Sequence, residues 1–202
     1  MKKAVYNTEF FKNEIQKEVS HSRYEHCLKV ASLAEKLALS HAYPHAEKAY
    51  LCGIVHDITK QKSRDFHIEL FERNNLNYRS EEIPLPAFHA FSGALYLREK
   101  YGLDDREILS AVKSHTLGDR KMGLLEKIVY VSDFLGSHFA MSHPRYEDWV
   151  NETCRDLNYG TYLKAMHVME ELIEKRQCIH PHTLEVYNLS LKYLKTDLDT
   201  HK

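Results

Sequence analysis

The chain has 202 residues, which suffices for one domain with a sizeable core but hardly for two. Its hydrophobic fraction of 43% and charged fraction of 28% exclude a disordered chain. A formal net charge of -1 excludes a global attraction to nucleic acid or to a membrane surface, so local charge would have to hold any anionic substrate.

The chain starts MKKAVYNTEFFKNEIQKEV, which is charged throughout and lacks the apolar stretch of a signal peptide. No apolar run approaches the length of about 18 residues that a membrane span needs. The 4 cysteines include no C-x-x-C pair, which argues against a zinc knuckle. We therefore predict a cytoplasmic protein with reduced thiols and with neither nucleic acid nor membrane as a partner.

Apolar residues recur at helical spacing along the whole chain, and strand-like alternation is nearly absent. Gly102 is predicted to end one helix, and Asp104 or Asp105 to cap the next. Helices are predicted at 8–19, 23–40, 45–58, 63–74, 87–101, 104–115, 123–136, 145–156, 159–177 and 182–195. The pattern predicts an all-α fold, with residues 1–202 forming one domain of antiparallel neighbours.

Several predicted helices carry a histidine or an aspartate on the stripe of residues that they bury. In the 23–40 helix, stepping back four residues from Val30 gives His26, and three more gives Arg23. The same spacing in later helices leads to His56 with Asp57 beside it and Lys60 one turn on, and to His89, His115 and Asp133. Burying such groups without partners costs several kcal/mol, so the set needs a shared cation or a hydrogen-bond network.

A single histidine on a buried face is more often hydrogen-bonded than a metal ligand, but the whole set favours a metal site. Mixed nitrogen and oxygen ligands suit iron, manganese or zinc, and the absence of a nearby cysteine argues against structural zinc. Gly53 and Gly93 would let helices approach closely around the site. The other histidines are predicted to be surface residues: His21, His41, His45, His67, His138, His143, His167, His180, His182 and His201.

These residues follow the order of the HD superfamily of metal phosphohydrolases, which the chain resembles through RYEH at 23–26, VHD at 55–57 and SD at 132–133. Within it, the segments FHAFSGALYL, HTLG, KIVYVSD and IHPHTLEVYN resemble the YqeK family of symmetrical dinucleoside tetraphosphate hydrolases. The resemblance runs from about Lys12 to Tyr193. It implies an HD-domain helical bundle with a buried metal site that holds two divalent or trivalent ions, with iron expected and manganese or zinc as alternatives.

The resemblance also implies a role for each candidate residue. It assigns one ion to His26, His56, Asp57 and Asp133, and the second to His89 and His115, with Asp57 bridging. Arg23 and Lys60 fall where phosphate contacts are expected. The implied reaction is attack on phosphorus by a hydroxide shared by the two ions, with Asp133 orienting it, and diadenosine tetraphosphate would yield two ADP.

The chain departs from the family pattern just after Asp133. A glutamate and an arginine are usual there, whereas this sequence has Gly136 at the first position and Phe139 at the second. No expected metal ligand is lost, but substrate contacts could differ. Arg120, Lys121 and Arg145 are candidates to replace the missing charge.

Two other interpretations of the sequence stay open. One is a mononuclear nucleotidase or (p)ppGpp hydrolase, in which His89 and His115 would be dispensable. The other is a nucleotide-sensing or partner-binding domain with reduced turnover, for which Gly136 and Phe139 would be signs of drift. The many tyrosines and phenylalanines could support a homodimer surface, although core packing explains them equally well.

Overall fold

The computed structural model describes residues 7–200, with side chains described for residues 7–194. This part of the chain is helical and contains no strand, which confirms the all-α prediction. The helices are α1 (Thr8–Glu18), α2 (His21–Ser40), α3 (Ala46–Val55), α4 (Arg64–Arg73), η1 (Leu85–Ala87), α5 (Phe88–Tyr101), α6 (Arg106–Ser114), α7 (Leu124–Leu135), α8 (His138–Ser142), α9 (Tyr146–Arg155), α10 (Leu157–Glu174) and α11 (Pro181–Thr200). None of the described helices is both long enough and apolar enough to cross a membrane.

Helix ends coincide with residues that satisfy the free backbone groups there. Asp105, rather than Asp104, caps α6 by accepting the N–H groups of Glu107 and Ile108 at 3.0 and 3.1 Å. Gly102 ends α5 in the left-handed region at φ 62, which a residue with a Cβ rarely adopts. The predicted glycine end of α5 is therefore confirmed.

The structure shortens one predicted helix and adds two short elements. The helix predicted over 45–58 ends at Val55, and residues 56–61 form turns. Two short elements, η1 and α8, were not predicted. Each is too short for a periodic apolar pattern to appear; the Ser137 hydroxyl, which accepts the Ala140 N–H at 3.1 Å, fixes the start of α8. The early end of α3 matters for function, because it places His56 and Asp57 on a turn.

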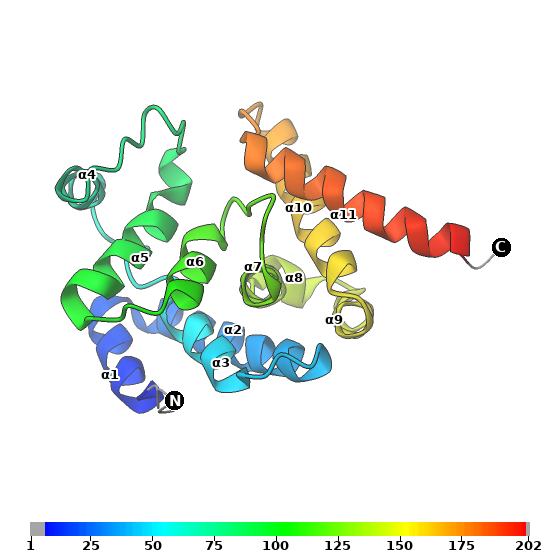
Figure 1. Cartoon of the computed structure of the whole chain (residues 1–202), viewed down its shortest axis with the longest axis horizontal. Coiled ribbons are helices and arrows are strands. Elements are labelled where there is room, and N and C mark those ends of the chain that lie inside the picture. Colours follow the sequence, from blue (N-terminus) through cyan, green and yellow to red (C-terminus); the bar gives the residue numbers. More distant parts are fainter. Residues whose placement is uncertain (1–6, 201–202) are drawn as a thin grey trace.

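One continuous apolar core runs through most of the bundle. It extends from Phe11 on α1 to Val186 on α11, and α7 contributes the fully buried ring of Tyr130. Figure 1 shows α2 and α3 side by side along one edge, α7 end-on near the middle, and α11 extending outward from beside α10. The α2–α3 contact requires Gly53, because a Cβ there would lie 2.4 Å from the Ala31 Cα. The predicted close approach at Gly53 is thereby confirmed.

A smaller apolar cluster joins α4 to α5 through Phe71 and Phe88. His67 lies beside it, only 4% exposed, with its Nδ1 2.8 Å from the Ser92 hydroxyl. Burial lowers the pKa of His67 to about 4, so the ring is neutral. The prediction that His67 is a surface residue is wrong, because α4 packs this face against α5. His201 lies outside the described residues.

The Glu18 carboxylate at the end of α1 gives a prediction about stability and pH. It accepts hydrogen bonds from the ammonium groups of Lys62 and Lys100 and from the Tyr96 hydroxyl, and its side chain is 8% exposed. Burial alone would raise the pKa of Glu18, but the two lysines outweigh it and hold the pKa at about 2. Because the folded pKa lies below the unfolded value of 4.5, this stabilisation is present above pH 4.5 and is lost as pH falls toward 2.

We therefore expect Glu18→Gln to lower the free energy of unfolding at pH 7 by roughly 2 kcal/mol. The difference from wild type should shrink as pH falls below 4.5. Urea denaturation over a pH series measures it, and Glu9→Gln on the same helix, whose side chain is 76% exposed, is the control. A Glu18→Gln deficit that stays constant down to pH 3 would contradict the electrostatic origin.

Candidate metal centre

Six side chains converge where α2, α5, α6 and α7 meet the turn after α3. Asp57 lies at the middle of the group and is 2% exposed. Four of its neighbours are imidazoles and one is a second carboxylate: His26, His56, His89, His115 and Asp133. The structure thus brings together all six residues that the sequence analysis selected as metal ligands.

The two carboxylate oxygens of Asp57 face different histidines. Its Oδ2 lies 3.4 Å from His56 Nε2 and 3.8 Å from His26 Nε2. Its Oδ1 lies 3.2 Å from His89 Nε2 and 3.6 Å from His115 Nε2. One carboxylate therefore stands between two pairs of imidazoles, with one oxygen toward each pair.

Asp133 completes the first of these groups. Its Oδ1 lies 3.2 Å from His26 Nε2 and 3.5 Å from His56 Nε2. The ligand atoms of His26, His56 and Asp133 lie within 4.8 Å of one another, as do those of His56, Asp57 and His115. Atoms that bind one cation at about 2 Å lie roughly 3 Å or more from one another, so these side chains could hold an ion between them.

Backbone carbonyls fix the orientation of three of the imidazoles. The Nδ1 atoms of His26, His56 and His115 lie 3.2, 2.8 and 2.7 Å from carbonyl oxygens of their surroundings. A carbonyl only accepts, so each Nδ1 donates to it and each Nε2 is directed at the carboxylates. Within the described residues, His56 Nε2 is buried and makes no hydrogen bond. A cation that displaces a proton from this nitrogen would find it in the direction of a metal ligand.

The electrostatics of the cluster favour a positive charge at its centre. Burial by itself would lower the pKa of His56, but the neighbouring carboxylates Asp57 and Asp133 raise it to about 10. Burial would raise the pKa of Asp57, but the surrounding imidazoles, led by His56, hold it well below its usual value. Burial lowers the pKa of His115 to about 4. Two ionised carboxylates among four imidazoles provide the mixed oxygen and nitrogen ligands of a first-row metal site.

Lys164 on α10 belongs to this centre and was missed by the sequence analysis. The residue is 4% exposed, and its ammonium group donates hydrogen bonds to the carbonyls of His115 and Tyr130, at 2.7 and 2.8 Å, and to Asp133 Oδ2 at 2.8 Å. These contacts leave only Oδ1 of Asp133 facing the histidines. The helical spacing indicates a buried position for Lys164, since it follows the buried residue Thr161 by three positions.

Hydroxyl groups support the His89 and His115 side of the centre. Thr59 Oγ1 donates to the His89 carbonyl at 2.9 Å and lies 2.8 Å from the Ser92 hydroxyl. The Thr116 hydroxyl lies 3.2 Å from His89 Nε2 and 3.1 Å from His115 Nε2. These threonines and the serine restrict how far the two imidazoles can move.

The two predicted phosphate-binding residues lie on different sides of the centre. Arg23 Nη1 is 3.0 Å from Asp57 Oδ2, and its side chain, 33% exposed, reaches a large open cavity. The cavity has a volume of about 990 Å³ and is also lined by His26 and Asp133. Lys60 instead extends beside His89, with its Nζ 3.2 Å from the His89 Nε2, and does not line this cavity.

Gly136 has a definite structural role. Its carbonyl oxygen lies 3.2 Å from His26 Nδ1 and helps to orient that ring. A Cβ at this position would lie 2.8 Å from Val30 Cγ2 and 3.1 Å from the Ser132 carbonyl oxygen. The close contact of α7 with α2 therefore favours glycine at position 136. The same packing holds His26, and it explains why glycine stands in place of the expected glutamate.

A helical bundle with buried histidines and aspartates in this order defines a class of metal-binding hydrolase domains. The sequence pattern of the HD domain family matches residues 23–136, and the chain belongs to that family. It is 29% identical to the symmetrical bis(5'-nucleosyl)-tetraphosphatase of Halalkalibacterium halodurans over 86% of this chain and 91% of the relative. The enzyme of the same name from Bacillus subtilis is 27% identical over 86% of this chain and 92% of its own length.

A solved structure agrees with this relationship. The crystal structure of a predicted HD superfamily hydrolase involved in NAD metabolism from Clostridium acetobutylicum superposes with a TM-score of 0.84. The alignment covers 93% of this chain and 98% of the other, at 25% sequence identity. The HD-domain fold expected from the sequence is thus confirmed over almost the whole chain.

Proposed function

We propose that this protein is a metal-dependent hydrolase that cleaves dinucleoside tetraphosphates symmetrically, releasing two ADP from diadenosine tetraphosphate. The relatives that align over most of the chain carry that activity in their names. The observation that carries the proposal is the position of Asp57, whose two oxygens face two separate pairs of imidazoles.

We assign the ligands accordingly. His26, His56, Asp133 and Oδ2 of Asp57 would hold one ion, and His89, His115 and Oδ1 of Asp57 the other. Iron is the metal that we propose, with manganese and zinc as alternatives that the same nitrogen and oxygen ligands suit. Bound ions would supply a nucleophilic water at neutral pH and neutralise charge on the phosphate oxygens.

The protein's own side chains would perform the remaining tasks. Arg23 reaches the cavity and can bind phosphate oxygens through two parallel N–H groups. The Asp133 side chain is 25% exposed and lines the cavity, whereas Asp57 is 3% exposed, so Asp133 is the carboxylate that can orient a water. Lys164 donates a hydrogen bond to Oδ2 of Asp133 and thereby fixes the direction of Oδ1. Lys60 adds positive charge on the His89 side.

The test combines metal analysis with identification of the products. Anaerobically prepared protein should contain close to two metal ions per chain and convert diadenosine tetraphosphate to ADP alone. Chromatography early in the reaction separates ADP from an equimolar mixture of ATP and AMP, which would refute symmetrical cleavage. A fully active protein with one ion, in which His89→Ala and His115→Ala retain activity, would refute the binuclear assignment. Cytoplasmic location and a homodimer stay predictions from the sequence.

A further inference from the structure

We infer that the exposed ring of Phe139, together with His167, forms a stacking subsite for a nucleobase of the substrate; this inference rests on the proposed function. Phe139 on α8 is 53% exposed and lines the same cavity as Arg23, His26 and Asp133. The cavity thus connects the metal centre directly with an uncovered aromatic surface. A nucleotide that placed its phosphates at the metal centre would extend its base along this wall.

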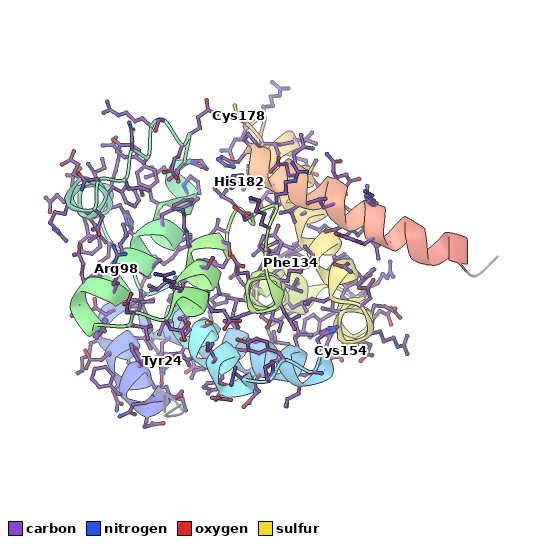
Figure 2. The ribbon with its side chains drawn as sticks, in the orientation of Figure 1. Tyr24, Arg98, Phe134, Cys154, Cys178 and His182 are labelled. Atoms are coloured by element: carbon purple, nitrogen blue, oxygen red, sulfur yellow. The ribbon has the colours of Figure 1, made fainter. Side chains whose placement is uncertain are left out.

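A packed aromatic group supports the Phe139 ring from behind. The His167 ring lies 5.3 Å from Phe139 and is stacked on Phe134 at 5.6 Å with an interplanar angle of 16°. Figure 2 labels Phe134 beside α7. Its ring lies 5.9 Å from that of Trp149, which is 3% exposed. The imidazole of His143 is stacked on Trp149 at 4.0 Å. Phe139 is therefore held on a rigid base while most of its own surface stays uncovered.

The charged side chains that line the cavity indicate where the phosphates and the base of a nucleotide would lie. Arg23 and Lys29 line one part of it together with the metal-centre residues. Farther along α10 the cavity is lined by Glu170, Glu171 and Glu174, with Lys175 paired to Glu171, and Glu170 Oε2 lies 2.9 Å from His167 Nδ1. A polyphosphate is attracted to the basic part and repelled by the acidic part. A neutral base is the portion of the substrate that fits beside His167 and Phe139.

His167 contributes the accessible part of its ring to this aromatic wall. Its Nδ1 pairs with Glu170, and its Nε2 is buried without a hydrogen-bond partner in the described part of the chain. A base stacked on Phe139 would therefore meet the ring of His167 rather than this buried nitrogen. Because every nucleobase has a π face, stacking tolerates different bases and contributes about 1–3 kcal/mol by alanine substitution. We therefore expect the subsite to accept adenine and guanine alike.

The experiment compares ADP with inorganic pyrophosphate as ligands of the metal-loaded protein, by calorimetry and by fluorescence of Trp149, the only tryptophan of the chain. Both ligands carry a diphosphate, and only ADP carries a base. In wild type, ADP should bind more tightly than pyrophosphate. Phe139→Ala should weaken ADP binding roughly 5- to 150-fold and leave pyrophosphate binding unchanged. Phe139→Tyr should retain ADP binding.

The control variant is Phe10→Ala, which removes a 44% exposed ring on α1, away from the cavity. Equal losses of ADP and pyrophosphate binding in Phe139→Ala, or no loss of ADP binding, would overturn the inference. The readout needs no turnover, so it separates this inference from the proposed function. A protein that cleaves diadenosine tetraphosphate but shows no Phe139-dependent preference for ADP refutes only the subsite. A Phe139-dependent preference without tetraphosphate cleavage supports the subsite and refutes the function.

Discussion

Replacing Asp57 by asparagine should abolish hydrolysis of diadenosine tetraphosphate while the helix content stays unchanged. Asp57 presents one oxygen to His26 and His56 and the other to His89 and His115. An amide has no negative charge and only one acceptor oxygen, so it would weaken both proposed ion sites together. We expect kcat to fall at least about 1000-fold, equivalent to about 4 kcal/mol of barrier.

Steady-state kinetics, metal analysis and circular dichroism measure this effect. Asp65→Asn on α4, an exposed aspartate in the first turn of its helix, is the matched control and should keep full activity. An Asp57→Asn enzyme within about tenfold of wild type would have lost only about 1.4 kcal/mol. So small a loss would rule out Asp57 as a carboxylate shared by two ions.

The second large effect is expected from Lys164→Met, which preserves the side-chain volume but removes the buried cation. The ammonium group of Lys164 now satisfies Oδ2 of Asp133 and the carbonyls of His115 and Tyr130. Without it, a carboxylate and two carbonyls lose their hydrogen-bond donor in a buried place. We expect the free energy of unfolding of the metal-free protein to fall by about 3 kcal/mol.

The same substitution should also weaken metal binding, because Asp133 would be free to turn its carboxylate. Denaturation of the metal-free protein and metal titration of the folded protein separate the two effects. Lys175→Met, just after the end of α10, is the control; that lysine is exposed and forms a surface ion pair with Glu171. A Lys164→Met protein as stable as wild type, with unchanged metal affinity, would show that Lys164 neither supports nor positions Asp133.

The sequence was sufficient to select the six candidate ligands. His26 continues an apolar stripe of α2, and Asp133 does so on α7, where a helix that buries one face must bury these polar groups too. The adjacent pair His56 and Asp57 required a cavity or a helix end if both were to face one site, since neighbours on a helix diverge by about 100°. The structure shows a helix end, because α3 stops at Val55.

Two further buried polar residues, His67 and Lys164, were within reach of the same rule but were not found by it. His67 stands three and four residues before the buried Leu70 and Phe71, and Lys164 three residues after Thr161. Histidine and lysine are common on surfaces, and the long stem of lysine lets its charge reach water from a buried stripe. For these two residues, the residue type indicated the surface although the helical spacing indicated a buried position. Only the packing of α4 on α5 and of α10 on α7 shows that both are buried.

Periodicity along the chain predicts the helical fold and selects the six candidate ligands, because helical spacing follows from local backbone geometry alone. Tertiary structure decided how those residues face one another. Asp57 directs one carboxylate oxygen toward each imidazole pair, and this arrangement depends on the mutual placement of helices far apart in the sequence. So does the cavity that joins Arg23 to Phe139, since α2, α7, α8 and α10 each supply part of its wall. No spacing along one helix encodes the distance between atoms on different helices, which packing fixes only when the whole core forms.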